Sequence, residues 1–251
     1  MSVCCFVADV HLGLDYNDPK GRETLFVSTL KSLPDNLTDL YLLGDIFDFW
    51  YEYKDVIPSG YTRTLGALSE LSDRGVKIHF FNGNHDIWTY RYFQKELNIT
   101  VETKPAVVEI DGKSLFLGHG DNLWDKSNGY KLLQKVFKSK MVQTLFSALH
   151  PRWAFLFGKS WSKHNRLTHN MSHEQYEELK SKISRQALEW AKEYRQQTLS
   201  KPIDYFITAH YHTPFEAQIE GGGEFFMLGD WIHHPDYILL DSEGIRRICA
   251  T

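Results

Sequence analysis

Seven side chains of types that bind metal ions stand in five short clusters along the chain. The clusters read Ala-Asp-Val-His, Leu-Gly-Asp, Gly-Asn-His-Asp, Gly-His-Gly-Asp and Ala-His-Tyr-His. Each follows or ends a short apolar run that is typical of a β-strand. Oxygen and nitrogen ligands gathered from many strand ends predict two metal ions and hydrolytic chemistry. The seven candidate ligands are Asp9, His11, Asp45, Asn84, His119, His210 and His212.

The first two clusters show how the ligands are expected to meet. Asp9 and His11 follow the apolar run 3–8 and stand two residues apart. In an extended chain such residues point the same way, so both are expected to reach one ion at the carboxyl edge of a sheet. Asp45 follows the run 39–43. Its two carboxylate oxygens each carry lone pairs, so it is the candidate to bridge two ions.

The ligand types narrow the choice of metal. Carboxylate, amide and imidazole ligands without a thiolate favour Mn²⁺, Fe²⁺ or Zn²⁺ over Ca²⁺, and Mn²⁺ is the first choice. A single Asp-x-His or His-x-His pair is weak support for a site. Five such clusters in order, each at a predicted strand end, form a much more specific pattern.

The elements that must hold these clusters alternate in the first hundred residues. Strand-like runs at 3–8, 39–43 and 76–82 enclose helical patterns around 25–33 and at 62–74, which predicts a parallel sheet with crossover helices. Further on, the runs 105–110 and 113–118 flank Asp111-Gly112, a hairpin signal. More strand-like runs follow at 203–208, 215–219, 224–228, 236–241 and 245–249. The chain is therefore expected to have an α/β fold with two sheets covered by helices.

A long helical segment, residues 126–199, is predicted to be an insertion that caps a core formed by residues 1–125 and 200–251. Its first half, from Lys131 to Arg166, contains eight Lys or Arg, no Asp or Glu, and many Phe, Leu and Trp. A basic and apolar cap beside a phosphate-cleaving centre fits an anionic amphiphile. The alternative is that the apolar residues pack the cap's own helices and the lysines are solvated. In the second half, Ser172 and Gln175 predict a capping box.

The composition of the chain limits the classes of protein to which it can belong. The chain has 251 residues, a net charge of −4 and three cysteines without a Cys-x-x-Cys motif. This does not suggest nucleic-acid binding, a disulfide framework or a thiolate zinc site, and no protein partner is evident. The N-terminus lacks a signal-peptide pattern and no apolar run could span a membrane, so a cytoplasmic location is expected.

The five clusters together resemble those of the calcineurin-like metallophosphoesterases. The resemblance implies a four-layer α-β-β-α sandwich of mixed sheets. It implies that Asp9, His11, Asp45 and His212 hold one ion, and that Asp45, Asn84, His119 and His210 hold the other. His85 would then face the substrate, to stabilise phosphoryl oxygens or protonate the leaving group. Asp48 matches the second aspartate of the family and is the candidate to orient His85, while Asp86 is expected to bond nearby backbone.

Within that superfamily, the whole chain is similar to the UDP-2,3-diacylglucosamine hydrolases, pyrophosphatases of lipid A biosynthesis. The resemblance rests on Leu-Gly-Asp-Ile-Phe-Asp-Phe-Trp at 43–50, Gly-His-Gly-Asp at 118–121 and Leu-Gly-Asp-Trp at 228–231. It implies release of UMP from UDP-2,3-diacylglucosamine, leaving 2,3-diacylglucosamine 1-phosphate, at the cytoplasmic face of the inner membrane. Many members have Arg in place of His85 and Glu in place of Asp48. The substrate contacts that the resemblance suggests are Asn84, Tyr130, Lys159, Lys163 and Arg166.

Three other readings of the sequence remain open. The chain could cleave small soluble phosphoesters such as nucleotides, which need no apolar chamber. It could be a non-catalytic scaffold on the same fold, although all seven ligands and His85 are present. The basic cap could also serve as a membrane- or partner-binding module, a role compatible with catalysis.

Overall fold

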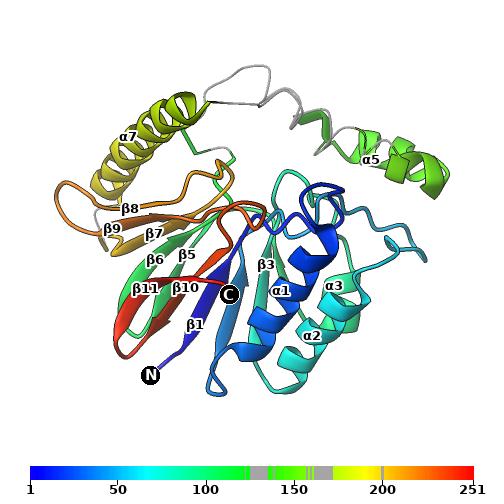
Figure 1. Ribbon diagram of the computed structural model, residues 1–251, viewed down its shortest axis with the longest axis horizontal. Helices are drawn as coiled ribbons and strands as arrows, with labels where there is room; N and C mark the ends of the chain where they lie inside the picture. Colours follow the sequence, from blue (N-terminus) through cyan, green and yellow to red (C-terminus); the bar gives the residue numbers. More distant parts are fainter. Residues whose placement is uncertain are drawn as a thin grey trace.

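The computed structural model describes residues 1–121, 123–124, 135–137, 139–156, 158, 160, 172–198 and 201–251. Two mixed β-sheets pack face to face, and helices cover their outer faces (Figure 1). This confirms the predicted α/β fold with two sheets between helical layers.

The first sheet carries the parallel strands of the N-terminal half. Its strand order is β11-β10-β1-β2-β3-β4, with β1 to β4 parallel and β10 antiparallel to β1. Helices α1, α2 and α3 cover its outer face, where Phe26, Leu68 and Phe93 are fully buried. The bounds are β1 Cys4–Val7, α1 Pro19–Ser32, β2 Asp39–Leu42, α2 Thr62–Asp73, β3 Lys77–Phe81, α3 Tyr92–Leu97, β4 Thr100–Glu102, β10 Asp236–Asp241 and β11 Gly244–Cys249.

The second sheet has the order β5-β6-β7-β9-β8. Its inner face packs against the first sheet through a buried hydrophobic layer that includes Phe6, Leu117 and Phe226. Helix α7, His173–Gln197, covers its outer face, where Ala187 and Ala191 are completely buried. The strands are β5 Ala106–Ile110, β6 Lys113–Leu117, β7 Tyr205–Thr208, β8 Phe215–Gln218 and β9 Glu224–Met227.

Local sequence signals account for most of these elements. Asp111 and Gly112 have φ of 48° and 83° and join β5 to β6, as the hairpin signal predicts. Ser172 and Gln175 form the predicted capping box of α7. The short elements α3 and β4 were not expected. A six-residue helix and a three-residue strand are too short to produce a clear periodic pattern.

Within residues 126–199, the structure describes α5, Lys140–Ser147, the helical residues 151–156 and α7. Because α7 packs on the second sheet, it forms the fourth layer of the sandwich as well as the end of the predicted insertion. The division into core and cap stays a prediction. Among the described helices, none combines the length and the apolarity that crossing a membrane requires.

Candidate metal centre

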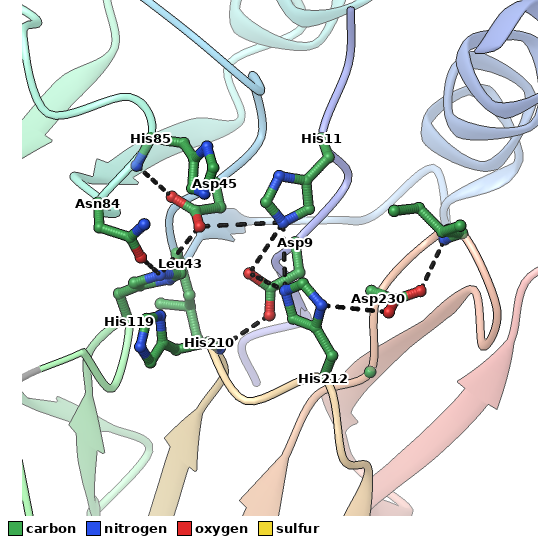
Figure 2. A network of polar contacts seen from close by, with 12 residues as sticks. Asp9, His11, Leu43, Asp45, Asn84, His85, His119, His210, His212 and Asp230 are labelled. Carbon is green, nitrogen blue, oxygen red and sulfur yellow. Dashed lines mark hydrogen bonds and ion pairs between the residues drawn. The ribbon is translucent and has the colours of Figure 1, made fainter. Parts of the chain in front are cut away.

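The seven candidate ligands meet at the loops where strands of both sheets end (Figure 2). Five of them, listed here with their φ angles, adopt the left-handed backbone conformation that non-glycine residues seldom use: Asp9 (51°), His11 (49°), Asp45 (52°), His210 (79°) and His212 (54°). Strained backbone of this kind clusters at functional sites. The backbone at Asp9 and His11 is therefore not extended as expected, although both side chains belong to one group of potential ligands.

Hydrogen bonds between the loops maintain this backbone. The N–H groups of Asp9 and His11 donate to the carbonyls of Gly44 and Asp45, at 3.1 and 2.9 Å. The N–H of His210 donates to Asp9 Oδ2 at 2.8 Å. Ligand loops of the two sheets are thus tied directly to each other.

One group of ligands comprises Asp9, His11 and His212. The Nε2 atoms of His11 and His212 lie 3.2 Å apart, and Asp9 Oδ1 lies 3.8 and 3.7 Å from them. Asp9 Oδ1 is buried and accepts no hydrogen bond from the residues that the structure describes. Two imidazole nitrogens and an orphaned carboxylate oxygen that converge on one point fit a divalent cation.

A second group comprises Asp45, His119 and His210. His119 Nδ1 lies 2.9 Å from the Leu43 carbonyl, which can only accept, so Nδ1 carries the proton. In a neutral ring the Nε2 lone pair then faces Asn84 Oδ1 at 3.2 Å and Asp45 Oδ2 at 3.3 Å. A lone pair opposite two oxygens is repulsive unless a proton or a cation lies between them. The donor set of this group also fits a metal ion.

Asp45 connects the two groups. Its Oδ2 lies 3.3 Å from His119 Nε2 on one side and 3.9 Å from His11 Nε2 on the other. Its Oδ1 accepts the backbone N–H of His85 at 2.8 Å. The carboxylate therefore stands between the two groups, where the sequence predicts a bridging ligand. The His and Asp clusters are consistent with a dimetal site, whereas the assignment of each ligand to an ion stays a prediction.

Asp230, which the sequence did not single out as functional, supports the first group. His212 Nδ1 lies 3.2 Å from Asp230 Oδ2, so the carboxylate can hold the proton on Nδ1 and leave Nε2 to face His11. Asp230 ends the run Leu228-Gly229-Asp230, which repeats the Leu-Gly-Asp pattern of Asp45. That repetition is the signal that could have identified it.

Burial and charge determine which of these groups hold protons. Burial lowers the pKa of His212, but the Asp9 and Asp230 carboxylates raise it to about 9. Burial and the charge of His119 lower the pKa of His210 to about 3. Burial raises the pKa of Asp45, yet His119 and His85 bring it well below its usual value. A cation bound here would have to replace protons.

His85 and Asp48 lie beside the metal cluster, as predicted, but their contact differs from the expected one. His85 Nδ1 lies 2.9 Å from the backbone carbonyl of Asp48 and 3.8 Å from its carboxylate Oδ1. The same Oδ1 is closer to His11 Nδ1, at 3.3 Å. Asp48 therefore contacts His85 through backbone and His11 through its side chain. Because the carbonyl can only accept, Nδ1 carries the proton and the lone pair of a neutral His85 ring is on Nε2.

Asp86 and Gly83 support the position of Asp45. The buried Asp86 carboxylate accepts the backbone N–H groups of Asp45, Ile46, Phe47 and Gly83, at 3.1, 2.8, 3.2 and 2.9 Å. This is the backbone-bonding role expected for it. Gly83 leaves room for the Asp45 carboxylate, since a Cβ at this position would lie 2.1 Å from Asp45 Oδ1.

The described parts of the insertion are anchored on two sides of the cluster. On one side, Tyr51 donates to the carbonyl of Gln143 at 3.1 Å and Trp88 Nε1 donates to that of Phe137 at 3.0 Å. On the other, Tyr176 of α7 donates to the His212 carbonyl at 3.4 Å. Asn84 lies in the cluster, whereas the other predicted substrate contacts, Tyr130, Lys159, Lys163 and Arg166, lie outside the described residues.

Comparisons with known proteins identify relatives of the chain. No protein-family model matches the chain. A Porphyromonas gingivalis (strain ATCC BAA-308 / W83) protein named UDP-2,3-diacylglucosamine hydrolase is 31% identical over 246 residues, covering 94% of this chain and 93% of the relative. A protein of the same name from Enterobacter sp. (strain 638) is 26% identical and covers 97% of each chain. Among solved structures, a dimetal phosphatase from Danio rerio aligns over 100% of this chain and 98% of its own, with 14% identity and a TM-score of 0.47.

The relatives, the sandwich and the clustered His and Asp side chains indicate a metal-dependent phosphoesterase. The chain therefore belongs to the calcineurin-like metallophosphoesterases, in the family of proteins named UDP-2,3-diacylglucosamine hydrolases.

Proposed function

We propose that the protein hydrolyses the diphosphate bridge of UDP-2,3-diacylglucosamine, giving UMP and 2,3-diacylglucosamine 1-phosphate for lipid A biosynthesis. The observation that carries the proposal is the double anchoring of the insertion, through Tyr51 and Trp88 on one side of the cluster and Tyr176 on the other. A relative of nearly equal length that carries this name supports the same substrate.

Two divalent cations would occupy the cluster, with Mn²⁺ as the first choice and Fe²⁺ or Zn²⁺ as alternatives. Asp9, His11, Asp45 and His212 would hold one, and Asp45, Asn84, His119 and His210 the other. When bound, such ions activate water at neutral pH and neutralise charge on the phosphoryl oxygens. The chain's contribution is to fix this geometry beforehand, through the backbone bonds between ligand loops and through Asp230 and Leu43 behind the imidazoles.

His85 is the proposed catalytic side chain outside the ligand set. The Asp48 carbonyl fixes its Nδ1 proton, and its Nε2 can bond a phosphoryl oxygen or give a proton to the leaving group. The ring is partly buried and its centroid is 5.0 Å from that of His11, so it borders the place where a phosphoryl group must lie. Asp48 keeps both imidazoles in position, His85 through its carbonyl and His11 through its carboxylate.

The cap is proposed to bind the lipid part of the substrate. Phe146 packs against Tyr51 and Trp88, with ring centroids 4.9 Å from each, so aromatic residues link the cap to the catalytic loops. Three basic residues of the cap, Lys159, Lys163 and Arg166, would meet phosphates, and Tyr130 and Asn84 would contact the diphosphate or the sugar.

Exposed apolar side chains on the described part of the cap also fit a lipid surface. They are Met141 and Leu145 of α5, Leu149 after its end, and Trp153 and Leu156 in the helical residues 151–156. Met141 and Trp153 are 70% and 64% exposed, which is unusual for such large apolar side chains. With Lys140 and Arg152 beside them, they form a surface suited to an anionic membrane. We place the protein in the cytoplasm, in peripheral contact with the inner membrane.

Substrate competition tests the proposed function. With Mn²⁺ supplied, hydrolysis is measured for the diacylated UDP-glucosamine, UDP-N-acetylglucosamine and bis(p-nitrophenyl) phosphate. Since burial contributes about 0.8 kcal/mol for each CH₂ group, two acyl chains should raise kcat/KM by at least about 100-fold over the unacylated sugar nucleotide. Hydrolysis of the generic diester alone, or equal rates for both sugar nucleotides, would contradict the lipid substrate and favour small soluble phosphoesters.

Vesicle binding tests the membrane surface separately. Wild-type protein should co-sediment with vesicles that contain anionic phospholipid. The triple variant Met141→Ser, Leu145→Ser, Trp153→Ser should bind at least about tenfold more weakly, because its insertion buries far less apolar area. Val107→Ser, on the exposed face of β5, is the control. Equal binding by the triple variant and the control would remove the membrane role from this surface.

A further inference from the structure

A second imidazole shares the carboxylate that supports ligand His212. Asp230 is buried, with 3% of its surface exposed, and its Oδ1 accepts the backbone N–H groups of Ile232 and His233 at 2.9 and 2.7 Å. His212 Nδ1 lies 3.2 Å from Oδ2. His233 Nδ1 lies 3.2 Å from both carboxylate oxygens. The carboxylate thus stands between an imidazole of the metal cluster and an imidazole outside it.

The two imidazoles differ in their surroundings. The His212 side chain is 27% exposed and turns its other nitrogen, Nε2, toward His11 and Asp9. The His233 side chain is 53% exposed and lies beside the ring of Tyr16, at a centroid distance of 6.5 Å. His233 is therefore accessible from solvent and yet only one carboxylate away from a ligand. In Figure 2, the bond between His212 and Asp230 marks the edge of the ligand cluster.

A carboxylate that bonds two imidazole N–H groups holds each less strongly than it would hold one. The hydrogen bond that His212 Nδ1–H donates to Asp230 makes His212 a better electron donor to a cation, because it draws the Nδ1 proton toward the carboxylate. A bond from His233 Nδ1–H withdraws part of that charge. The two backbone N–H donors already fix the orientation of Asp230, so the effect of His233 is electronic more than structural.

We propose that His233 is a positioning residue of the metal centre, which weakens the support of Asp230 for His212 and so limits the affinity for the ion held by Asp9, His11 and His212. The inference rests on the proposed two-ion centre, and it adds a residue outside the ligand set that adjusts metal affinity. Faster exchange of the cation at this position is its direct consequence.

The test compares metal binding in the wild type and four variants, using metal-free chain titrated with Mn²⁺ by calorimetry and with Co²⁺ by absorption spectroscopy. His233→Ala should bind the ion held by Asp9, His11 and His212 about threefold more tightly than wild type does. It should also shift the Co²⁺ d–d bands. Asp230→Asn should bind about 10- to 100-fold more weakly, the usual effect of losing a partner behind a ligand. His233→Asn restores one N–H donor near the Nδ1 position and should return affinity and spectrum toward wild type.

His234→Ala is the matched control, because this neighbouring histidine is also exposed and contacts Asp230 through backbone. Equal affinities for His233→Ala and His234→Ala, or weaker binding by His233→Ala, would overturn the proposal and leave His233 a surface residue. None of these measurements requires a substrate. Failure of the UMP-release assay would therefore contradict the proposed function and leave this inference standing. Unchanged metal affinities in the variants would contradict this inference and leave the proposed function standing.

Discussion

Replacing His85 with asparagine separates the two nitrogens of this side chain. An Asn amide N–H can reproduce the Nδ1 bond to the Asp48 carbonyl, 2.9 Å long in the structure, but nothing replaces Nε2. If Nε2 acts on the phosphoryl group or the leaving group, His85→Asn should lower kcat by about 10²- to 10⁴-fold, the usual contribution of general acid–base catalysis. This range corresponds to about 3–5 kcal/mol of activation free energy.

Stability and metal content provide the second half of the prediction. His85→Ala also loses the bond to Asp48, a net of about 1 kcal/mol, which should lower Tm by roughly 2–4 °C in a chain of this size. His85→Asn should keep the wild-type Tm. Both variants should keep the wild-type metal content, because His85 is outside the predicted ligand set. His85→Arg, which matches many members of the resembling family, should recover part of the activity.

The assay combines steady-state kinetics on one phosphoester substrate with elemental analysis of the same samples. His79→Asn is the control, since His79 lies within β3 and stacks on Tyr41, with ring centroids 4.6 Å apart. Loss of one metal equivalent in His85→Asn would make His85 a ligand, together with its neighbours His11 and Asp48. A kcat within about threefold of wild type would show that Nε2 takes no part in the reaction.

Two further predictions concern the ligands themselves. Gly83→Ala should displace Asp45 and abolish tight metal binding, since its Cβ would lie 2.1 Å from Asp45 Oδ1. The control is Gly66→Ala, within α2 and with open space around it. It should leave metal binding unchanged and stabilise the fold by up to about 1 kcal/mol. Because the pKa of His212 is raised to about 9 in the metal-free chain, a cation must displace its proton below that pH. Apparent affinity should therefore rise with pH and level off above about 9, and calorimetry in buffers of different ionisation enthalpy should detect proton release at neutral pH; pH-independent binding between 7 and 9 would refute this reasoning.

The sequence predicts the location of the centre better than its internal geometry. Clusters at strand ends identify the ligand loops, because parallel strands deliver their carboxyl ends to one edge of a sheet. The left-handed loop at Asp9 and His11 could not be foreseen in the same way. Its left-handed residues are stabilised by bonds to Gly44 and Asp45, which are distant in sequence.

Helix α3 and the role of Asp230 were missed because they too depend on contacts between residues distant in sequence. Helix α3 begins where Glu52 accepts the N–H groups of Tyr90, Arg91 and Tyr92, so its N-terminal cap comes from some forty residues away. Asp230 reaches His212 because β9 pairs with β7. Local propensity carries no information on either contact. Capping at Ser172 and the turn at Asp111 are local, and there the sequence predicts the structure correctly.

Metal stoichiometry tests the central claim most directly. Wild-type chain loaded with Mn²⁺ and freed of excess should contain about two equivalents. His212→Ala and His210→Ala should each retain about one, because each removes a ligand of a different ion. Asp45→Ala should retain less than either, since it removes the carboxylate that stands between the two groups. Full phosphoesterase activity with one equivalent or none, or identical metal loss in all three variants without loss of activity, would contradict the two-ion centre.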